Sequence, residues 1–158
     1  EDGQFDTTVK PQILLTDKTR KYVLINDDIL FAAKGINNYA VVYKNEMGSA
    51  VASSSFIIIR IDNNFRSKLS PQYLAWYLSN NKELISFRLQ TGTTIPSISI
   101  KYLLDLEIRI PEIEKQMLIL NIQQLHNQEM KIMKQLTTLK NRYIKDKLLK
   151  EINQIKYE

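Results

Sequence analysis

The sequence is poor in the residues that most often build chemical sites. Its 158 residues include no cysteine, one histidine and four glycines. A chain without cysteine has no disulfide, no thiolate nucleophile and no cysteine-bound metal. We therefore expect no metal and no cofactor. The composition is consistent with a reducing compartment, and we expect the cytoplasm.

Glycine-rich loops and catalytic signatures are also missing. The four glycines are scattered and form no phosphate-binding loop, and the (N/D)PPY motif expected of an amino-methyltransferase is absent. Glu129-Met130-Lys131 matches only the end of a nuclease motif and has no carboxylate partners in nearby strands. His126 has no second ligand at helical spacing. The sequence therefore predicts a protein that is not an enzyme.

Long hydrophobic runs are absent too. No run approaches the roughly 18 apolar residues of a membrane span, so we expect no membrane partner. The net charge of +5 permits a polyanionic partner without requiring one. Because the sequence begins at Glu1 rather than at a methionine, we expect residues to be missing before it.

The first part of the chain contains short apolar runs separated by turn residues. Runs at 22–25, 29–33, 39–43 and 50–61 are rich in β-branched and aromatic residues, and a turn follows every eight to twelve residues. This pattern predicts a twisted, mostly antiparallel sheet. Ser70-Pro71 then provides an N-cap and a first helical residue. We expect two short helices after it, the second ending at Gly92.

The stretch from Thr91 to Pro111 joins this part to the rest of the chain. Ile95-Pro96 favours an extended backbone. Leu106, Ile108 and Ile110 alternate as in a strand, and Pro111 suits the first residue of a helix.

One long helix is predicted from Glu112 to Tyr157. Its apolar residues keep the four-three spacing of a heptad seam, which Glu129 interrupts and which shifts phase near Lys145. An exposed seam of this length needs a partner helix. The fold class is therefore α+β, with a recognition domain at 1–110 and a long coiled-coil helix at 111–158. The seam residues are Leu118, Ile122, Leu125, Ile132, Leu136, Leu139 and Tyr143.

Four motifs, in this order, resemble the specificity subunit of type I restriction–modification systems. Asp28–Phe31 followed by Lys34-Gly35 is similar to "GDILF…(K/R)xG", and Ala52–Arg60 resembles a serine-rich strand. Leu69–Leu78 resembles "SPEYLxxYL". Gly92–Gln116 resembles "G(S/T)TIPSLSKxxLxxLxIxxPPLxEQ". This chain departs from the pattern at Asn26-Asp27, where the family usually has a glycine before Asp-Ile-Leu.

The resemblance implies a non-catalytic subunit that recognises double-stranded DNA and works with separate modification and restriction subunits. Family members usually carry two recognition domains and two long helices, whereas this chain has one of each. A natural half-subunit and a piece of a longer chain both fit this length. The resemblance implies that a half-length chain forms a homodimer through antiparallel helices and reads a bipartite site with inverted-repeat symmetry.

The candidate DNA contacts combine cations for phosphates with short polar side chains for base edges. The turn at 34–39 and the loop at 91–101 have both kinds of residue, but they equally fit an ordinary hairpin turn and a capped helix–loop connection. The small serines at 53–55 also suit close packing. The candidates are Lys34, Gly35, Asn37, Asn38, Tyr39, Ser54, Thr91, Gly92, Thr93, Thr94, Ser97 and Lys101.

Two further points stay open in the sequence. Tyr73, Trp76 and Tyr77 have aromatic rings that can stack on bases, but their helical spacing favours core positions. The long helix also fits a coiled-coil adaptor whose sheet domain binds protein rather than DNA.

Overall fold

The computed structural model describes residues 16–35, 38–90 and 97–154. The chain divides into two compact units, Glu1–Met117 and Leu118–Glu158. The assignment of separate roles to residues 1–110 and 111–158 stays a prediction.

A small antiparallel sheet is the centre of the first unit. Within the described residues it has three strands in the order β2-β1-β3: β1 (Ile29–Ala32), β2 (Ala40–Val42) and β3 (Phe56–Ile59). β1 pairs with both neighbours, with Leu30 opposite Val41 on one side and Ile58 on the other. Every residue of β1 is buried. The α+β fold class is confirmed.

The first expected strand is largely wrong. Residues 22–25 form only a bridge between Val23 and Val51, supported by hydrogen bonds from Leu24 N to Ala50 O and from Ala52 N to Tyr22 O. The apolar run at 50–61 is likewise divided, and only Phe56–Ile59 forms a strand. Ser53, Ser54 and Ser55, which precede this strand, are exposed, and the chain turns at these residues.

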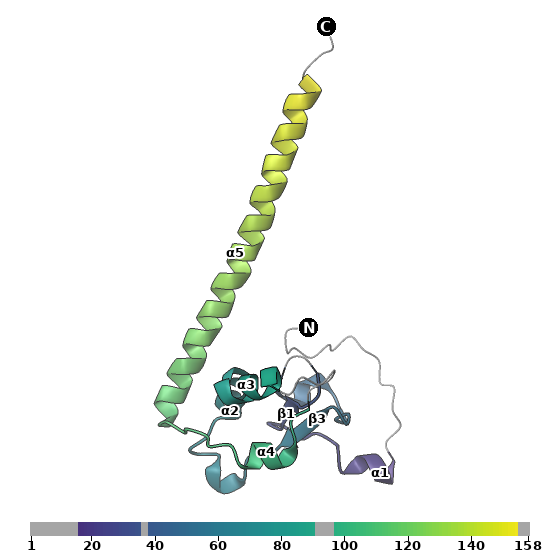
Figure 1. Cartoon of the computed structure of the whole chain (residues 1–158), viewed down its shortest axis with the longest axis vertical. Coiled ribbons are helices and arrows are strands. Elements are labelled where there is room, and N and C mark those ends of the chain that lie inside the picture. The colour runs from purple at the N-terminus through teal and green to yellow at the C-terminus, as the bar shows by residue number, and fades with distance from the viewer. Residues whose placement is uncertain (1–15, 36–37, 91–96, 155–158) are drawn as a thin grey trace. The chain divides into compact units, whose positions relative to one another are not determined.

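Helix α2 (Pro71–Asn80) packs against β2 and β1 (Figure 1). Ser70 caps it, as predicted, by accepting a hydrogen bond from Tyr73 N through its hydroxyl. Leu74 and Leu78 are buried, and the Ser79 hydroxyl accepts a hydrogen bond of 2.8 Å from Ala40 N on β2. Helix α3 (Lys82–Gln90) follows, also as predicted. The expected stop at Gly92 lies outside the described residues.

Two short helices were not predicted. They are α1 (Asp17–Arg20) and α4 (Ile100–Leu104), and two 3-10 turns also occur, η1 (Asn45–Met47) and η2 (Asn63–Phe65). Helices of four or five residues are too short to produce an apolar period. The one feature of the sequence that indicates α4 is Ser99, a residue type favoured at helix N-caps. Its Oγ accepts a hydrogen bond from Tyr102 N.

The predicted strand at 106–110 is wrong. Its carbonyl groups meet tyrosine hydroxyls of α2 instead of a neighbouring strand: Tyr73 Oη donates to Arg109 O at 2.9 Å, and Tyr77 Oη donates to Glu107 O at 3.3 Å. Pro111 is also not the first helical residue. The long helix α5 begins at Ile113, and Glu112 O accepts the first helical hydrogen bonds from Lys115 N and Gln116 N.

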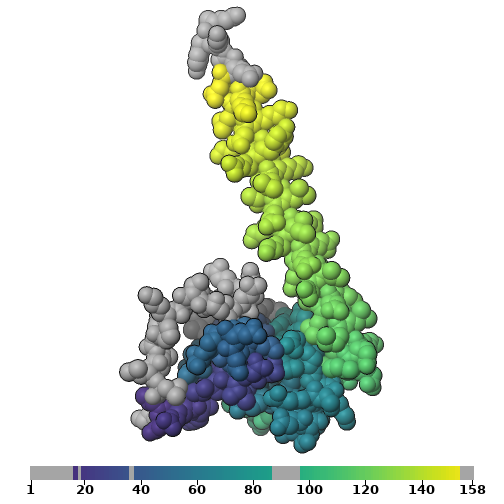
Figure 2. Space-filling model, turned by 180° about the vertical axis from the view of Figure 1, so that it is seen from behind, coloured from purple at the N-terminus to yellow at the C-terminus, as the bar shows by residue number. Residues whose placement is uncertain are grey.

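Helix α5 (Ile113–Gln154) confirms the prediction of one long helix over the described range. Its 42 residues span roughly 63 Å at about 1.5 Å per residue. The apolar seam side chains are exposed. Figure 2 shows the residues of α5 in green to yellow as a space-filling surface. Among the described helices, none is both long enough and apolar enough to cross a membrane.

Candidate nucleic-acid interface

Three segments that are distant in the sequence meet at the end of β1. Ala33 N donates a hydrogen bond of 3.0 Å to Ser55 O, and Ala33 O accepts one of 2.9 Å from Ile98 N. Lys34 pairs with Ser97 in an antiparallel bridge. The structure thus brings together the turn after β1, the serine segment before β3 and the segment that leads into α4. We call these residues (33–35, 53–55 and 97–101) the β1-end surface.

The β1-end surface carries cations and hydroxyl groups that face solvent. Lys34 and Lys101 are exposed, and within the described parts of the chain neither takes part in an ion pair. Ser54 and Ser97 are exposed as well. Exposed ammonium groups beside hydroxyl groups suit a phosphate backbone and the base edges next to it.

The described residues of the 34–39 segment contact the end of β1 and β3. Gly35 has φ +117°, in the left-handed region that favours glycine. The side-chain amide of Asn38 donates to Ala32 O at 2.8 Å, so one of its donors is committed to the turn. Tyr39 O accepts a hydrogen bond from Ala32 N. The rings of Tyr39 and Phe56 pack edge to face, with their centroids 6.4 Å apart. Asn38 and Tyr39 are therefore engaged with residues of the sheet, while Lys34 is exposed.

The remaining candidates are only partly placed. Asn37, Thr91, Gly92, Thr93 and Thr94 lie outside the described residues. Of the three aromatic residues on α2, Tyr73 is buried, and Trp76 and Tyr77 are half-buried. Burial raises the pKa of Tyr73, with a smaller contribution from Tyr77. The core interpretation of Tyr73 is confirmed.

At the opposite end of β1, basic side chains form ion pairs with Asp27 and Asp28. Asp28 is fully buried and accepts two hydrogen bonds of 2.7 Å from Arg60, and a third from Ile25 N at 2.9 Å. The hydrogen bonds to Asp28 raise the pKa of Arg60. Asp27 forms an ion pair of 2.6 Å with Lys44 and lies 3.9 Å from Arg66. The cations here are paired with carboxylates, unlike those of the β1-end surface.

Gln116 in the first turn of α5 is the principal residue that reasoning from the sequence alone did not single out. It is fully buried, and its amide makes three hydrogen bonds to main-chain groups. Nε2 donates to Lys68 O at 2.6 Å and to Pro111 O at 2.7 Å, and Oε1 accepts from Ser70 N at 2.9 Å. Gln116 therefore fixes the start of α5 to the segment that leads into α2. The available signal was its place in the last of the four motifs.

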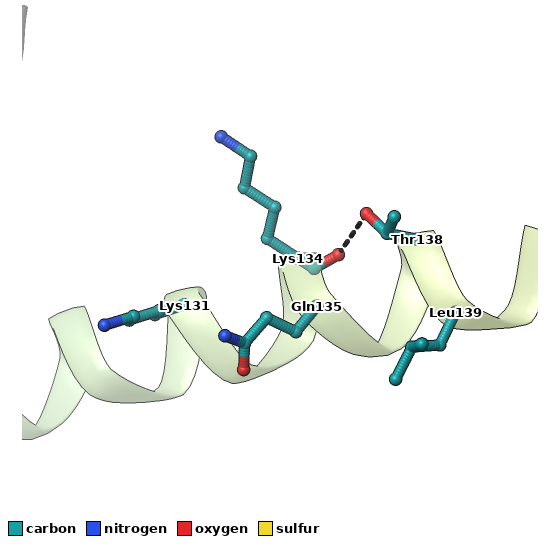
Figure 3. Close-up of a pocket in the computed structure, with 5 residues that line it drawn as sticks. All are labelled: Lys131, Lys134, Gln135, Thr138 and Leu139. Carbon is teal, nitrogen blue, oxygen red and sulfur yellow. Dashed lines mark hydrogen bonds between the residues drawn. The ribbon is translucent and has the colours of Figure 1, made fainter.

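The seam of α5 is uncovered. Its apolar members are between 57% (Leu118) and 66% (Tyr143) exposed. An open depression on this helix is lined by Lys131, Lys134, Gln135, Thr138 and Leu139 (Figure 3). All five belong to α5, and the one hydrogen bond drawn, from Thr138 Oγ1 to Lys134 O, is internal to the helix. The depression is thus a surface groove rather than a ligand cavity.

Within the described parts of the chain, no group of three or more aspartate, glutamate, histidine or cysteine residues is placed to hold a metal ion. His126 Nδ1 lies 3.8 Å from Glu129, an i,i+3 neighbour on the exposed surface of α5.

Comparison with family models identifies a match over most of the chain. Residues 5–154 match the family model of the type I restriction modification DNA specificity domain. No curated protein matches the chain significantly.

Proposed function

The chain belongs to the family of type I restriction modification DNA specificity domains, and from that premise we propose that it reads one half of a bipartite DNA site and positions the modification and restriction subunits on it. Members of this family are DNA-recognition subunits. They are generally non-catalytic and associate with the other restriction–modification subunits. We propose that this chain acts in the cytoplasm.

The observation that carries the proposal is the β1-end surface. Two cations without carboxylate partners among the described residues, Lys34 and Lys101, lie in segments joined by the bridge between Lys34 and Ser97. Lysine side chains position a protein on phosphates, and short polar side chains read base edges. At the other end of β1, Arg60 and Lys44 form ion pairs with Asp28 and Asp27. Because these positive charges are already neutralised, that end attracts a polyanion less strongly.

The presence of one recognition unit and one long helix supports the proposal that this chain reads half a site. It supplies one recognition unit and one long helix with an exposed apolar seam. We propose that two copies pair through antiparallel α5 helices, so that each copy reads one half of an inverted repeat.

Co-expression with the cognate modification subunit, followed by mapping of methylated positions, tests this function. We expect methylation at a split motif with inverted-repeat symmetry, and the map gives the motif, the symmetry and the spacer together. Equal affinity for every duplex sequence in the presence of the modification subunit contradicts the proposal. Such a result, with binding that also does not depend on salt, favours the adaptor alternative.

A further inference from the structure

Positive charge on α5 is concentrated on one side of the helix. Successive residues of an α-helix are separated by about 100° around its axis, and six residues between 127 and 145 fall within a sector of roughly 80°. We call these six residues the basic face: Asn127, Lys131, Lys134, Thr138, Arg142 and Lys145. All of them are exposed. Between 127 and 145, no carboxylate and no apolar residue falls in the same sector.

The basic face lies away from the apolar seam. The seam residues are roughly 100–160° around the helix axis from the centre of the basic face. Figure 3 shows Lys134 and Thr138 extending from one side of the helix and the seam residue Leu139 extending from another. A helix that packs through its seam therefore leaves the basic face uncovered.

The positive charges of the basic face have almost no compensation. None of its three lysines has an aspartate or glutamate three or four positions away in either direction. Within the described residues, none of these lysines forms an ion pair. Arg142 lies 3.9 Å from Asp146, and because both side chains are exposed this ion pair is weak. The four cations therefore repel one another in the isolated chain.

The carboxylates of α5 lie elsewhere around the axis. Glu114, Glu129 and Glu151 are at least about 120° from the centre of the basic face. Asp146 lies beside its edge, next to Arg142. A solvated helix face typically carries charges of both signs, with opposite charges three or four residues apart. The separation of charge on α5 thus indicates a polyanionic partner for the basic face.

The length and chemistry of the basic face suit duplex DNA. Lys131 and Lys145 are 14 positions apart, which is roughly 21 Å along the axis. A duplex carries one negative charge per about 1.7 Å of its own axis, so phosphates are available along this whole length. Cationic side chains that contact phosphates position a protein without reading the sequence.

A protein partner fits the basic face less well. The centres of protein interfaces are apolar, enriched in aromatic residues and methionine, and depleted in lysine. The basic face has no apolar member, and three of its four cations are lysines.

We propose that the basic face of α5 binds the phosphate backbone of duplex DNA outside the base pairs that the first unit reads. The inference rests on the proposed DNA recognition and adds a second contact to it. The β1-end surface then selects the sequence, and the basic face holds the duplex whatever its sequence.

Removal of two charges tests the inference in the full chain. K131Q/K134Q removes two cations of the basic face. The matched control K147Q/K150Q removes two cations from the other side of the same helix, where each lysine has a carboxylate four positions away, Glu151 and Asp146 respectively. Glutamine has nearly the helix propensity of lysine, so neither variant disturbs α5.

Fluorescence anisotropy with duplexes of several unrelated sequences, each at several salt concentrations, gives the salt slope of binding. We expect K131Q/K134Q to lower the slope by about 2 on every duplex, because each lost phosphate contact contributes about 0.9. The control is expected to keep the slope of the parent chain. K145Q, which removes the third lysine of the basic face, is expected to lower the slope by about 1.

Equal slopes for K131Q/K134Q and K147Q/K150Q overturn the inference. A K145Q variant with the slope of the parent chain also overturns it. A third contrary outcome is a K131Q/K134Q variant that binds DNA as the parent does but no longer retains the modification subunit in a pull-down, because the basic face then docks on protein.

Failure of this inference is distinguishable from failure of DNA reading. Equal affinity for every duplex, together with a lowered slope in K131Q/K134Q, overturns the proposed reading and leaves the basic face as a DNA contact. Binding that prefers one sequence, with the slope unchanged in K131Q/K134Q, overturns the basic face alone. A parent chain that binds no duplex at low salt overturns both.

Discussion

At the residue scale, Lys34 is the candidate DNA contact whose removal tests DNA binding without disturbing the fold. It is exposed and takes part in no ion pair with another described residue, so its loss leaves the fold intact. If it meets a phosphate, Lys34→Ala lowers the salt slope of DNA binding by about 1 and weakens binding to all sequences similarly. Fluorescence anisotropy at several salt concentrations measures both effects.

Lys44→Ala is the matched control for this measurement. It removes the same charge from the other end of β1, where Asp27 already neutralises the cation at 2.6 Å. The assignment of the β1-end surface is wrong if the two variants lose the same amount of salt dependence.

Asp27 explains one departure of this sequence from its family. The φ of Asp27 is +70°, in the left-handed region of the backbone. Glycine adopts this conformation more readily than other residues, which agrees with the glycine that the family usually has before Asp-Ile-Leu. Asp27→Gly and Asp27→Ala both remove the ion pair with Lys44, so the difference between them isolates the backbone strain. We expect the glycine variant to be more stable than the alanine variant by about 1 kcal/mol in urea unfolding. Equal stability would mean that the turn relaxes.

At the scale of elements, Gln116 controls how α5 begins. Gln116→Ala leaves Ser70 N and two carbonyl groups without their partner in a buried place. We expect a loss of roughly 2–4 kcal/mol in the free energy of unfolding of the first unit. Gln124→Ala, an exposed glutamine of the same helix, is the control and is expected to change stability by less than about 0.5 kcal/mol. Similar unfolding of the two variants would contradict the anchoring role.

The elements also show what the sequence could predict. β1, Ser70-Pro71 and α5 were predictable because their signals are local: an apolar run, a cap followed by proline, and a heptad period. The alternation of Leu106, Ile108 and Ile110 was misleading, because the partners of that segment are hydroxyls of α2 rather than a strand. The helices α1 and α4 were too short to show a period.

The candidate site was predictable only in parts. Residue types suggested Lys34, Ser54 and Ser97 separately, but the pairing of 34 with 97 is a contact between distant segments that no local pattern contains. The commitment of the Asn38 amide to Ala32 O was hidden for the same reason, since turn residues look alike whether they bind a ligand or their own backbone.

At the scale of the whole molecule, the proposed pairing of two copies depends on the seam. Leu125→Asp introduces a charge at a seam position that is 65% exposed in the single chain and covered in the proposed pair. We expect its dimer dissociation constant, measured by sedimentation or light scattering over a dilution series, to rise at least about tenfold, or 1.4 kcal/mol. Gln124→Asp adds the same charge beside the seam and is expected to change it little. Equal constants for the two variants would remove the seam from the interface.

The hydrogen bonds of Gln116 bear on how such a protein can diversify. All three of its partners are main-chain groups, at Lys68, Ser70 and Pro111. A main-chain partner is present whatever side chain the residue carries, so these three hydrogen bonds do not depend on the side chains at Lys68 and Pro111. A first unit of different sequence that keeps this backbone path and the glutamine is therefore expected to keep the same three hydrogen bonds to the start of α5.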